Sequence, residues 1–507
     1  MEYQESMSAS ALAQIRNQIF DSLHLHNWAD GIMDLIDTLS SAGQVRSVVE
    51  LSLQPAFHGR HYSGLYKAVR YFPLSGSQLR AIFADYLPHP QERPFRLLAV
   101  DTVPHPRPFA DCLQDRGYIY QPNPTPGGKP VAVGHTYSLL AFLPERESAS
   151  SPPWVVFLDA RRVATDQNAA QVAQEQVSQW LEVQEQTEQP LPACRTLVEA
   201  DTRFSTPDFI YPLAAEKGSN VLVRVRSNRV FFCPPPQSER ATRGHPRWYG
   251  KRFALDDPTT WPHPDEEESW EETTHRGRTL VVHLEAWRGM RMRGTRQWPM
   301  HLCPCTLIRV WTTAPEGEMV HPRPLWLALF GPCQPAPRHG GPAPRHGGPA
   351  ACGSGGGQEE WPLREVVRAY LQRSHQEHGH RFLKRNLLAT TYQTPEVRNE
   401  EHWWRLVLVA AFQIWLARDV AQSLPRPWER YLFQRQEGGA SPKAVPPSHV
   451  QRDMGRIIRA LGSPARRLQP RGKPVGRRKG MRLTPRARPG IVRKGATKGS
   501  QTASQPN

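Results

Sequence analysis

Two acidic residues of this sequence stand where apolar strands end. Asp101 closes the run LLAVD, and Asp201 closes the run TLVEAD. A charged side chain at the end of a buried strand is costly unless it reaches the edge of a sheet or holds a cation. For either residue alone, an ordinary aspartate that starts a turn is the simpler interpretation.

A third carboxylate, Glu377, lies among cations in the stretch YLQRSHQEHGHRFLK at 370–384. Arg373 follows Tyr370 by three residues, and Glu377 follows Tyr370 by seven. Lys384 follows Tyr370 by 14 residues. On a single helix, at about 100° per residue, all four fall within an arc of about 60°. One interpretation is a solvated charged face with Arg373 and Glu377 as an i,i+4 pair, and the other is a binding face.

Three carboxylates are a ligand set that can hold two divalent cations about 4 Å apart. In such a site one cation activates water or a 3′-hydroxyl and the other stabilises the leaving oxygen of a phosphoryl transfer. Mg²⁺ suits the site because it accepts a few carboxylates and keeps several waters. Asp101, Asp201 and Glu377 together therefore predict a two-Mg²⁺ site, in which Mn²⁺ is expected to substitute.

The elements that must position these residues follow an α/β order. Three strand-like runs come first, then a helix, a fourth strand, another helix and a fifth strand. The runs are PFRLLAVDTV, AVGHTYSLLAFL, PWVVFLDARRV, the helix at 168–186, CRTLVEAD at 194–201 and NVLVRVRSN at 220–228.

Residues 8 to about 90 show helical apolar spacing and precede the first strand. Two short helices around the PLSG turn, with Ser75 or Ser77 as an N-cap, would suit a helix-turn-helix reader of DNA. The cations near this pair are Arg60, Lys67, Arg70 and Arg80. A plain helical bundle is an equally good interpretation.

Residues 229–331 differ from the α/β part, because they hold prolines, the acidic patch DEEESWEE at 265–272 and further β-like runs. A linker follows, with PAPRHGG twice in tandem at 335–348. It ends where the helix carrying Glu377 begins. The apolar run at 406–417 is too short to span a bilayer and is read as a buried helix.

At these residues the chain resembles the DDE transposases of bacterial insertion sequences, in the group with a β-rich insertion before the catalytic glutamate. That group carries the signature Y-x-x-R-x-x-x-E-x-x-x-x-x-x-K, which the stretch 370–384 fills without slippage. Its two aspartates end the first and fourth strands, the places of Asp101 and Asp201. The resemblance covers about 93–425, and the chain departs from it in the Pro/Gly linker.

The resemblance implies an α/β fold: an RNase H-like mixed sheet flanked by helices, with a β-rich insertion, an N-terminal helical domain and a disordered basic C-terminal tail. The expected parts are a helical DNA-binding domain at 1–92, the first part of the catalytic core at 93–228, the insertion at 229–334, the linker at 335–357, the second part of the core at 358–425 and the tail at 426–507.

The resemblance also implies roles for the residues. Asp101, Asp201 and Glu377 would bind the metal ions and carry the chemistry. Tyr370, Arg373 and Lys384 would hold DNA phosphates, and Arg381 shares their face. The implied partners are double-stranded DNA, as terminal inverted repeats and target, and a second copy of the chain, since two ends must be paired.

Other candidate sites are weaker. Asp159 also ends a strand run, but in the expected strand order it would lie about 10 Å from Asp101, too far to share ions. His375, His378 and His380 lack the HExxH pattern of a zinc site, and HLCPC at 301–305 lacks a second ligand pair. Four insertion tryptophans are more simply core residues than base-stacking platforms: Trp287, Trp298, Trp311 and Trp326.

Composition points to a polyanionic partner. The 507 residues carry a net charge of +17 and include 50 prolines. Residues 451–507 contain sixteen Lys and Arg against Asp453 alone, which leaves 48 basic and 46 acidic residues elsewhere. Such a tail is expected to bind DNA rather than fold alone. Seven scattered cysteines indicate no disulfide framework, and the N-terminus shows no signal peptide, so we expect a cytoplasmic, nucleoid-associated bacterial protein.

The sequence thus favours a cut-and-paste transposase of an insertion sequence. Two alternatives remain open: a catalytically inactive or repurposed transposase-derived DNA-binding protein, and an RNase H-like nuclease that never joins strands.

Overall fold

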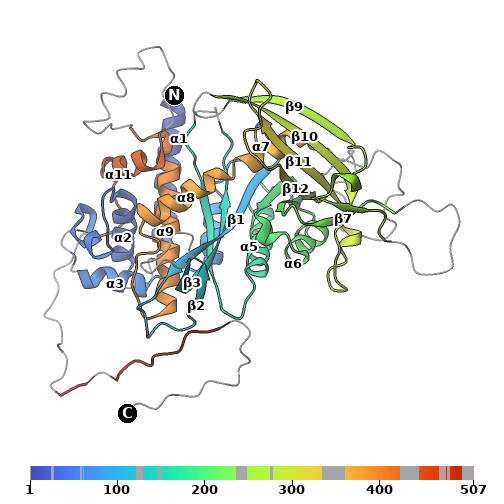
Figure 1. The fold of residues 1–507 in the computed structure, drawn as a ribbon. Coiled ribbons are helices and arrows are strands. Elements are labelled where there is room, and N and C mark those ends of the chain that lie inside the picture. The colour runs from blue at the N-terminus through green and yellow to red at the C-terminus, as the bar shows by residue number, and fades with distance from the viewer. Residues whose placement is uncertain are drawn as a thin grey trace.

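The computed structural model shows one large mixed sheet with helices on both faces (Figure 1). It describes residues 2–23, 28–57, 60, 62–120, 130–146, 151–235, 248–273, 278–333, 360–422, 445–466, 476, 480–482 and 484–493. The repeated PAPRHGG linker lies outside these residues. This architecture confirms the predicted α/β, RNase H-like fold class.

Five strands form the predicted core: β1 (Arg96–Pro106), β3 (Val131–Phe142), β4 (Val156–Val163), β5 (Thr196–Ala200) and β6 (Asn220–Val225). They lie in the order β4-β3-β1-β5-β6, with β1, β5 and β6 parallel and β3 antiparallel to its neighbours. A short strand, β2 (Gly117–Tyr120), also pairs with β3. The first and fourth predicted strands, β1 and β5, are therefore direct neighbours.

The insertion prolongs this sheet. Its strands are β9 (Glu266–Thr273), β10 (Thr279–Met290), β11 (Cys305–Thr313) and β12 (Leu325–Phe330). β12 pairs with β6, and β11, β10 and β9 follow in antiparallel order to the edge. β7 (Val230–Phe232) and β8 (Arg252–Ala254) form a separate two-stranded ribbon. The acidic patch at 265–272 is thus largely the edge strand of the sheet.

Helices on opposite faces hold the core strands (Figure 1). α9 (Val397–Leu416) covers one face, where Glu400 accepts hydrogen bonds from His135 and Tyr137 of β3. α5 (Ala169–Glu185) covers the other, and Gln176 donates to the backbone of Ser138. Asn168 caps α5 by accepting from the Ala170 amide, as such residues favour. α6 (Pro207–Tyr211) packs beside α5.

The N-terminal helices pack onto this core. They are α1 (Glu2–Leu23), α2 (Ala29–Ser41), α3 (Tyr62–Arg70) and α4 (Gly76–Ala84), with short 3₁₀ turns at Val49–Leu53 and Pro55–Phe57. Ser75 caps α4 in a capping box with Gln78. Arg80, however, is 5 % exposed and pairs with Asp159 of β4 at 3.0 Å. α4 therefore lies against the sheet, and Arg80 is not the DNA-facing cation that a helix-turn-helix would need.

The helix predicted to carry Tyr370 through Lys384 is two helices. α7 (Leu363–Leu371) ends before Gln372, and α8 (Ser374–Arg385) begins after Arg373. The amide of Arg373 bonds to the carbonyl of Tyr370, three residues back, so the chain tightens at this junction. Gln372 is held there from outside the helix, because it accepts from Arg93 and donates to the Pro144 carbonyl. The prediction of one continuous helix was wrong for this tertiary reason.

Part of the predicted C-terminal tail is also folded. α11 (Pro447–Leu461) packs on α2 and α9 and buries Val450, Met454 and Ile457. These residues repeat at helical spacing, a pattern that the basic composition of 451–507 hides. Further along, the amide of Val492 donates to the Arg116 carbonyl beside β2.

Two smaller findings complete the fold. Cys194 is disulfide-bonded, which the scattered cysteines of the sequence did not suggest, whereas Cys112, Cys233, Cys303 and Cys305 form no disulfide. Within the described residues, none of the helices is both long and apolar enough to cross a membrane. The predicted apolar run at 406–417 lies mainly in α9, whose Trp403, Trp404 and Ile414 are fully buried.

Candidate active site

Asp101 and Asp201 lie at the same level of neighbouring strands. Asp201 follows the last residue of β5, as predicted, but Asp101 lies in the middle of β1, so the prediction that it ends its strand was wrong. β1 continues to Pro106 because β3 still pairs with it beyond the end of β5. Val100 of β1 lies beside Ala200 of β5 in the parallel register, so the next residue on each strand is the aspartate. Asp101 Oδ1 accepts a 2.7 Å bond from the Thr102 amide. Asp201 Oδ1 is buried and has no hydrogen-bond partner. The structure thus places two carboxylates side by side, one with an unsatisfied oxygen.

Arg373 lies over this pair from the junction between α7 and α8. Its Nη2 is 3.3 Å from Asp101 Oδ2, and the two side chains are 17 % and 29 % exposed. Burial raises the pKa of the Asp101 carboxyl, while the Arg373 guanidinium opposes that rise. Burial disfavours the charged guanidinium in turn, yet Asp101 and Asp201 raise the pKa of Arg373. The guanidinium of Arg373 therefore supplies the positive charge beside Asp101 in this structure.

Lys384 and Tyr370 flank the same place. Lys384 is half-buried; burial lowers the pKa of its ammonium group, and Asp101 opposes the change. Tyr370 is 7 % exposed, and burial raises the pKa of its phenol. Asp201 contributes to that rise, so the phenol lies within the field of the carboxylates. Tyr370 and Lys384, two of the four predicted DNA-binding residues, thus interact electrostatically with the aspartates.

Glu377 and Arg381 are exposed on α8. The structure records no hydrogen bond or ion pair for Glu377 within the described part of the chain. In these described residues, no three His, Cys, Asp or Glu side chains converge closely enough to hold a metal ion. The three predicted carboxylates are therefore not gathered into a ready-made metal site.

The donor set nevertheless fits a divalent cation. Hard cations such as Mg²⁺ take carboxylate oxygens, and two carboxylates with several waters are enough to hold one. The unsatisfied Oδ1 of Asp201 is a buried acceptor in need of a positive partner. At Asp101, the Arg373 guanidinium supplies the positive charge that a bound metal ion would otherwise supply.

A further carboxylate, Glu199, belongs to the surroundings of this site and was not singled out from the sequence. It is fully buried on β5, and neither of its carboxylate oxygens has a hydrogen-bond partner. Burial raises its pKa well above the ordinary value, against the pull of Arg373 and Arg93. Glu199 could have been found from the run TLVEAD, because it precedes Asp201 by two residues and residues two apart on a strand share a face.

The alternative candidate residues Asp159 and His380 do not join the site around Asp101. Asp159 lies on the opposite face of the sheet from Asp101, since it is paired with Leu140, and Leu140 with Val100. It also forms buried ion pairs with Arg80 and Arg161. His380 packs against Phe157, and burial lowers its pKa to about 3. Asp159 and His380 are therefore structural residues.

The insertion tryptophans divide into core and surface residues. Trp287 and Trp326 are each 2 % exposed and pack on one another. Trp298 is half-buried beside Tyr211. Trp311 is half-buried on β11, stacked on His283 at 5.1 Å. Core packing is thus the observed fate of two of the four.

Comparison with protein families identifies the chain. A family described as DDE superfamily endonuclease matches residues 19–289. This chain belongs to the DDE superfamily of endonucleases. The matched range includes Asp101 and Asp201 and ends before α7, so it does not reach Glu377. No curated protein sequence matches the chain. Endonucleases of this superfamily generally use divalent metals, which agrees with the carboxylates on β1 and β5.

Proposed function

We propose that this DDE endonuclease is the transposase of an insertion sequence, cutting DNA at the terminal inverted repeats and joining the 3′-hydroxyl ends to target DNA. The observation that carries the proposal is the pair of neighbouring aspartates, Asp101 within β1 and Asp201 after β5, with Arg373 paired to Asp101 and the Lys384 ammonium group interacting with it. Carboxylates that can bind metal and cations that can bind phosphate are needed at the same place for phosphoryl transfer on DNA.

Asp101 and Asp201 would hold two Mg²⁺ ions, or Mn²⁺ in their place, with Glu377 completing the set. When bound, these ions supply an activated hydroxyl and stabilise the leaving oxygen. Glu377 lies in the first turn of α8, four residues after Arg373. Glu377 would have to approach the aspartates when metal and DNA bind.

The cations of the α7–α8 segment would orient the scissile strand. Arg373 offers a planar guanidinium that can bind a phosphate with two parallel hydrogen bonds, and Lys384 offers a point charge. Tyr370, which is buried, would support Arg373 from below rather than reach far into solvent. Arg381 is exposed on α8 and would contact the backbone further from the cut.

The remaining parts of the proposal concern partners. Two transposon ends must be held together, so the active species would be a homodimer on double-stranded DNA. The basic residues after Arg466 would add sequence-independent affinity. The protein would act on the bacterial chromosome, in the cytoplasm.

The test is cleavage and joining of a labelled DNA fragment that carries an inverted repeat, in Mg²⁺. Asp101→Ala, Asp201→Ala and Glu377→Ala should abolish cleavage while binding to the fragment changes by only a few fold. Asp159→Asn is the matched control, because Asp159 is a strand aspartate on the other face; it should lose stability but keep its cleavage rate at low temperature.

Each outcome has a separate meaning. Normal cutting by one of the alanine variants would remove that residue from the site. Cutting by the wild type without joining would leave a DDE nuclease that is not a transposase. Binding to the repeat without any cutting would favour a repurposed DNA-binding protein.

A further inference from the structure

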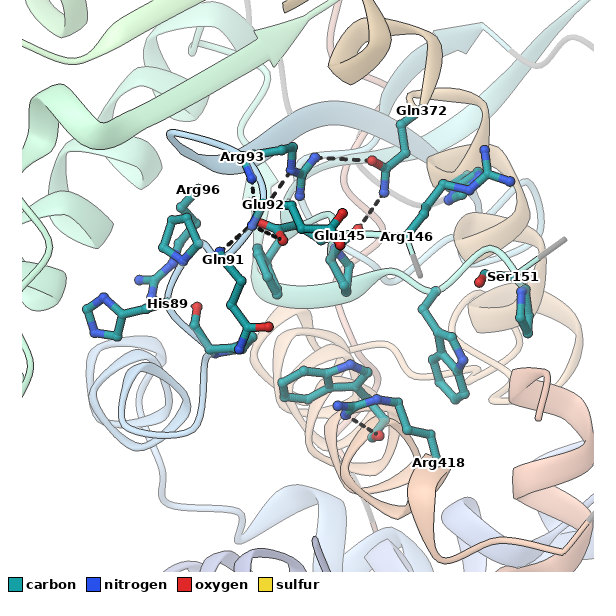
Figure 2. A pocket seen from close by; sticks show the side chains of 18 of the residues that line it. His89, Gln91, Glu92, Arg93, Arg96, Glu145, Arg146, Ser151, Gln372 and Arg418 are labelled. Atoms are coloured by element: carbon teal, nitrogen blue, oxygen red, sulfur yellow. Dashed lines mark hydrogen bonds and ion pairs between the residues drawn. The ribbon is translucent and has the colours of Figure 1, made fainter. Parts of the chain in front are cut away.

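A cavity of about 540 Å³ opens behind the α7–α8 junction, beside the start of β1. Its walls come from the loop before β1, the end of β3 and the end of α9. Gln372 and His375 line it on the side of the junction. Figure 2 shows Arg93 and Gln372 bonded together on one side of the cavity and Arg418 across from them. Its size is that of a small-molecule site.

The charges around this cavity favour an anion. Arg93, Arg96, Arg146 and Arg418 line it, against Glu92, Glu145 and Asp419. Two of these acids already have partners. Glu145 accepts from the amides of 91, 92 and 93, and Asp419 lies 3.3 Å from Arg418. The lining thus carries four guanidinium groups against three carboxylates, a formal excess of one positive charge.

Buried donors in the lining lack acceptors. Trp415 is 2 % exposed, and its indole Nε1 has no hydrogen-bond partner. Among the described residues, the Nε atoms of Arg93 and Arg96 are also buried without a hydrogen-bond acceptor, although Arg93 Nε lies 3.8 Å from Glu145 Oε1. An N–H group left in this state costs about 1–3 kcal/mol, so the site gains from a ligand that brings acceptor oxygens.

The wall also holds a partly exposed tryptophan, Trp154, which packs against the hydrophobic core. Trp154 is half-buried at the cavity, and the structure records no ring or cation contact on it within the described residues. Trp415, by contrast, carries Arg418 over its ring at 4.7 Å. A flat ring could thus stack on Trp154 while an anionic group lies toward Arg418.

We infer that this cavity binds a free nucleotide, with its base on Trp154 and its phosphate among the arginines. The planar base matches the partly exposed indole of Trp154, and the phosphate supplies acceptors for buried donors such as Trp415 Nε1. Because Gln372 directly precedes Arg373, a bound nucleotide would contact the junction that holds Arg373 over Asp101.

Isothermal titration of the full-length protein without DNA tests the site, with AMP, adenosine, ribose 5-phosphate and inorganic phosphate as separate probes. AMP should bind one to one. Adenosine and ribose 5-phosphate should each bind at least about fivefold more weakly, since each lacks one recognised group. Equal binding of AMP and inorganic phosphate, or no binding of AMP, would overturn the proposal.

Variants locate the site. Trp154→Ala should weaken AMP binding by about fivefold or more, whereas Trp154→Phe should retain most of it because a ring remains. Trp415→Phe should cost a few fold by removing one donor while preserving the packing. Trp248→Ala, which changes an indole that is 38 % exposed in the insertion, is the control and should bind AMP normally.

The variants also separate this site from binding elsewhere on a basic protein. If Trp154→Ala unfolds at the temperature of the wild type and binds AMP as well as the wild type does, the nucleotide is held at another place and the proposal fails. If Trp248→Ala alone weakens binding, the ligand belongs to the insertion, which equally excludes the cavity.

Discussion

Replacing Arg373 by Gln should tighten metal binding to the DNA-free protein while it impairs DNA cleavage. In the structure Arg373 is paired with Asp101 at 3.3 Å, so a cation must displace the guanidinium to bind that carboxylate. Glutamine removes the competing charge and keeps a similar length. A variant that gains metal affinity and loses activity is an unusual outcome, and therefore an informative one.

The size of the gain follows from the pair. Two unit charges at this distance attract by roughly 5 kcal/mol at an effective dielectric constant of 20. The side chains are 17 % and 29 % exposed, which screens the pair and leaves about 1–2 kcal/mol. Since 1.4 kcal/mol is a factor of ten, metal affinity should rise about tenfold.

Titration of Mn²⁺ into DNA-free protein, followed by calorimetry, measures this change. Lys384→Gln is the matched control: its ammonium group interacts with Asp101 but forms no ion pair with it in the structure, so the gain should be smaller. Glu377→Gln should leave DNA-free affinity unchanged if Glu377 joins the site only with DNA. A variant at Arg373 that binds Mn²⁺ no more tightly than the wild type would show that Arg373 and the metal do not compete.

Three further outcomes are expected. Burial raises the pKa of Glu199, so wild-type stability should fall as pH rises above about 4.5, the ordinary pKa of glutamate, until this carboxyl ionises in the folded state. In thermal unfolding, Glu199→Gln should remove that dependence on pH, whereas Glu182→Gln, an exposed control, should not. Glu400→Gln should destabilise the fold by about 3–5 kcal/mol in denaturant unfolding, because it leaves buried cationic partners unpaired. Deleting 467–507, which removes twelve Lys and Arg, should make the slope of log K against log[salt] for DNA shallower by about 5 if half of them contact phosphates, whereas an unchanged slope would exclude the tail from DNA binding.

The core strands could be predicted because apolar composition alone marks a strand buried on both faces. β1, β5 and β6 read as such runs, and their place in the sheet agrees with the order of the resembling family. The helix after β4 was equally plain, since Asn168 supplies its cap and the apolar residues recur at helical spacing. Local pattern and tertiary packing agree at these places.

The break between α7 and α8 could not be predicted, because the residues around Gln372 all favour a helix. What tightens the chain is the pair of bonds from Gln372 to Arg93 and to the Pro144 carbonyl, more than 200 positions away in the sequence. β9 was hidden for the opposite reason. A run of glutamates disfavours a strand, and the ion pairs of β9 with Arg288 of β10 and with Arg364 and Arg368 of α7 compensate.

Those ion pairs give the insertion a mechanical link to the site. Arg368 of α7 lies 3.2 Å from Glu272 of β9, and Arg364 lies over the ring of Trp270 at 5.2 Å. β9 to β12 form one continuous sheet with β6, so the insertion is fixed both to the core strands and to α7. α7 in turn ends at the junction that carries Arg373. A shift of the insertion strands, for example on binding DNA, would therefore also shift α7 and the junction that holds Arg373 beside Asp101.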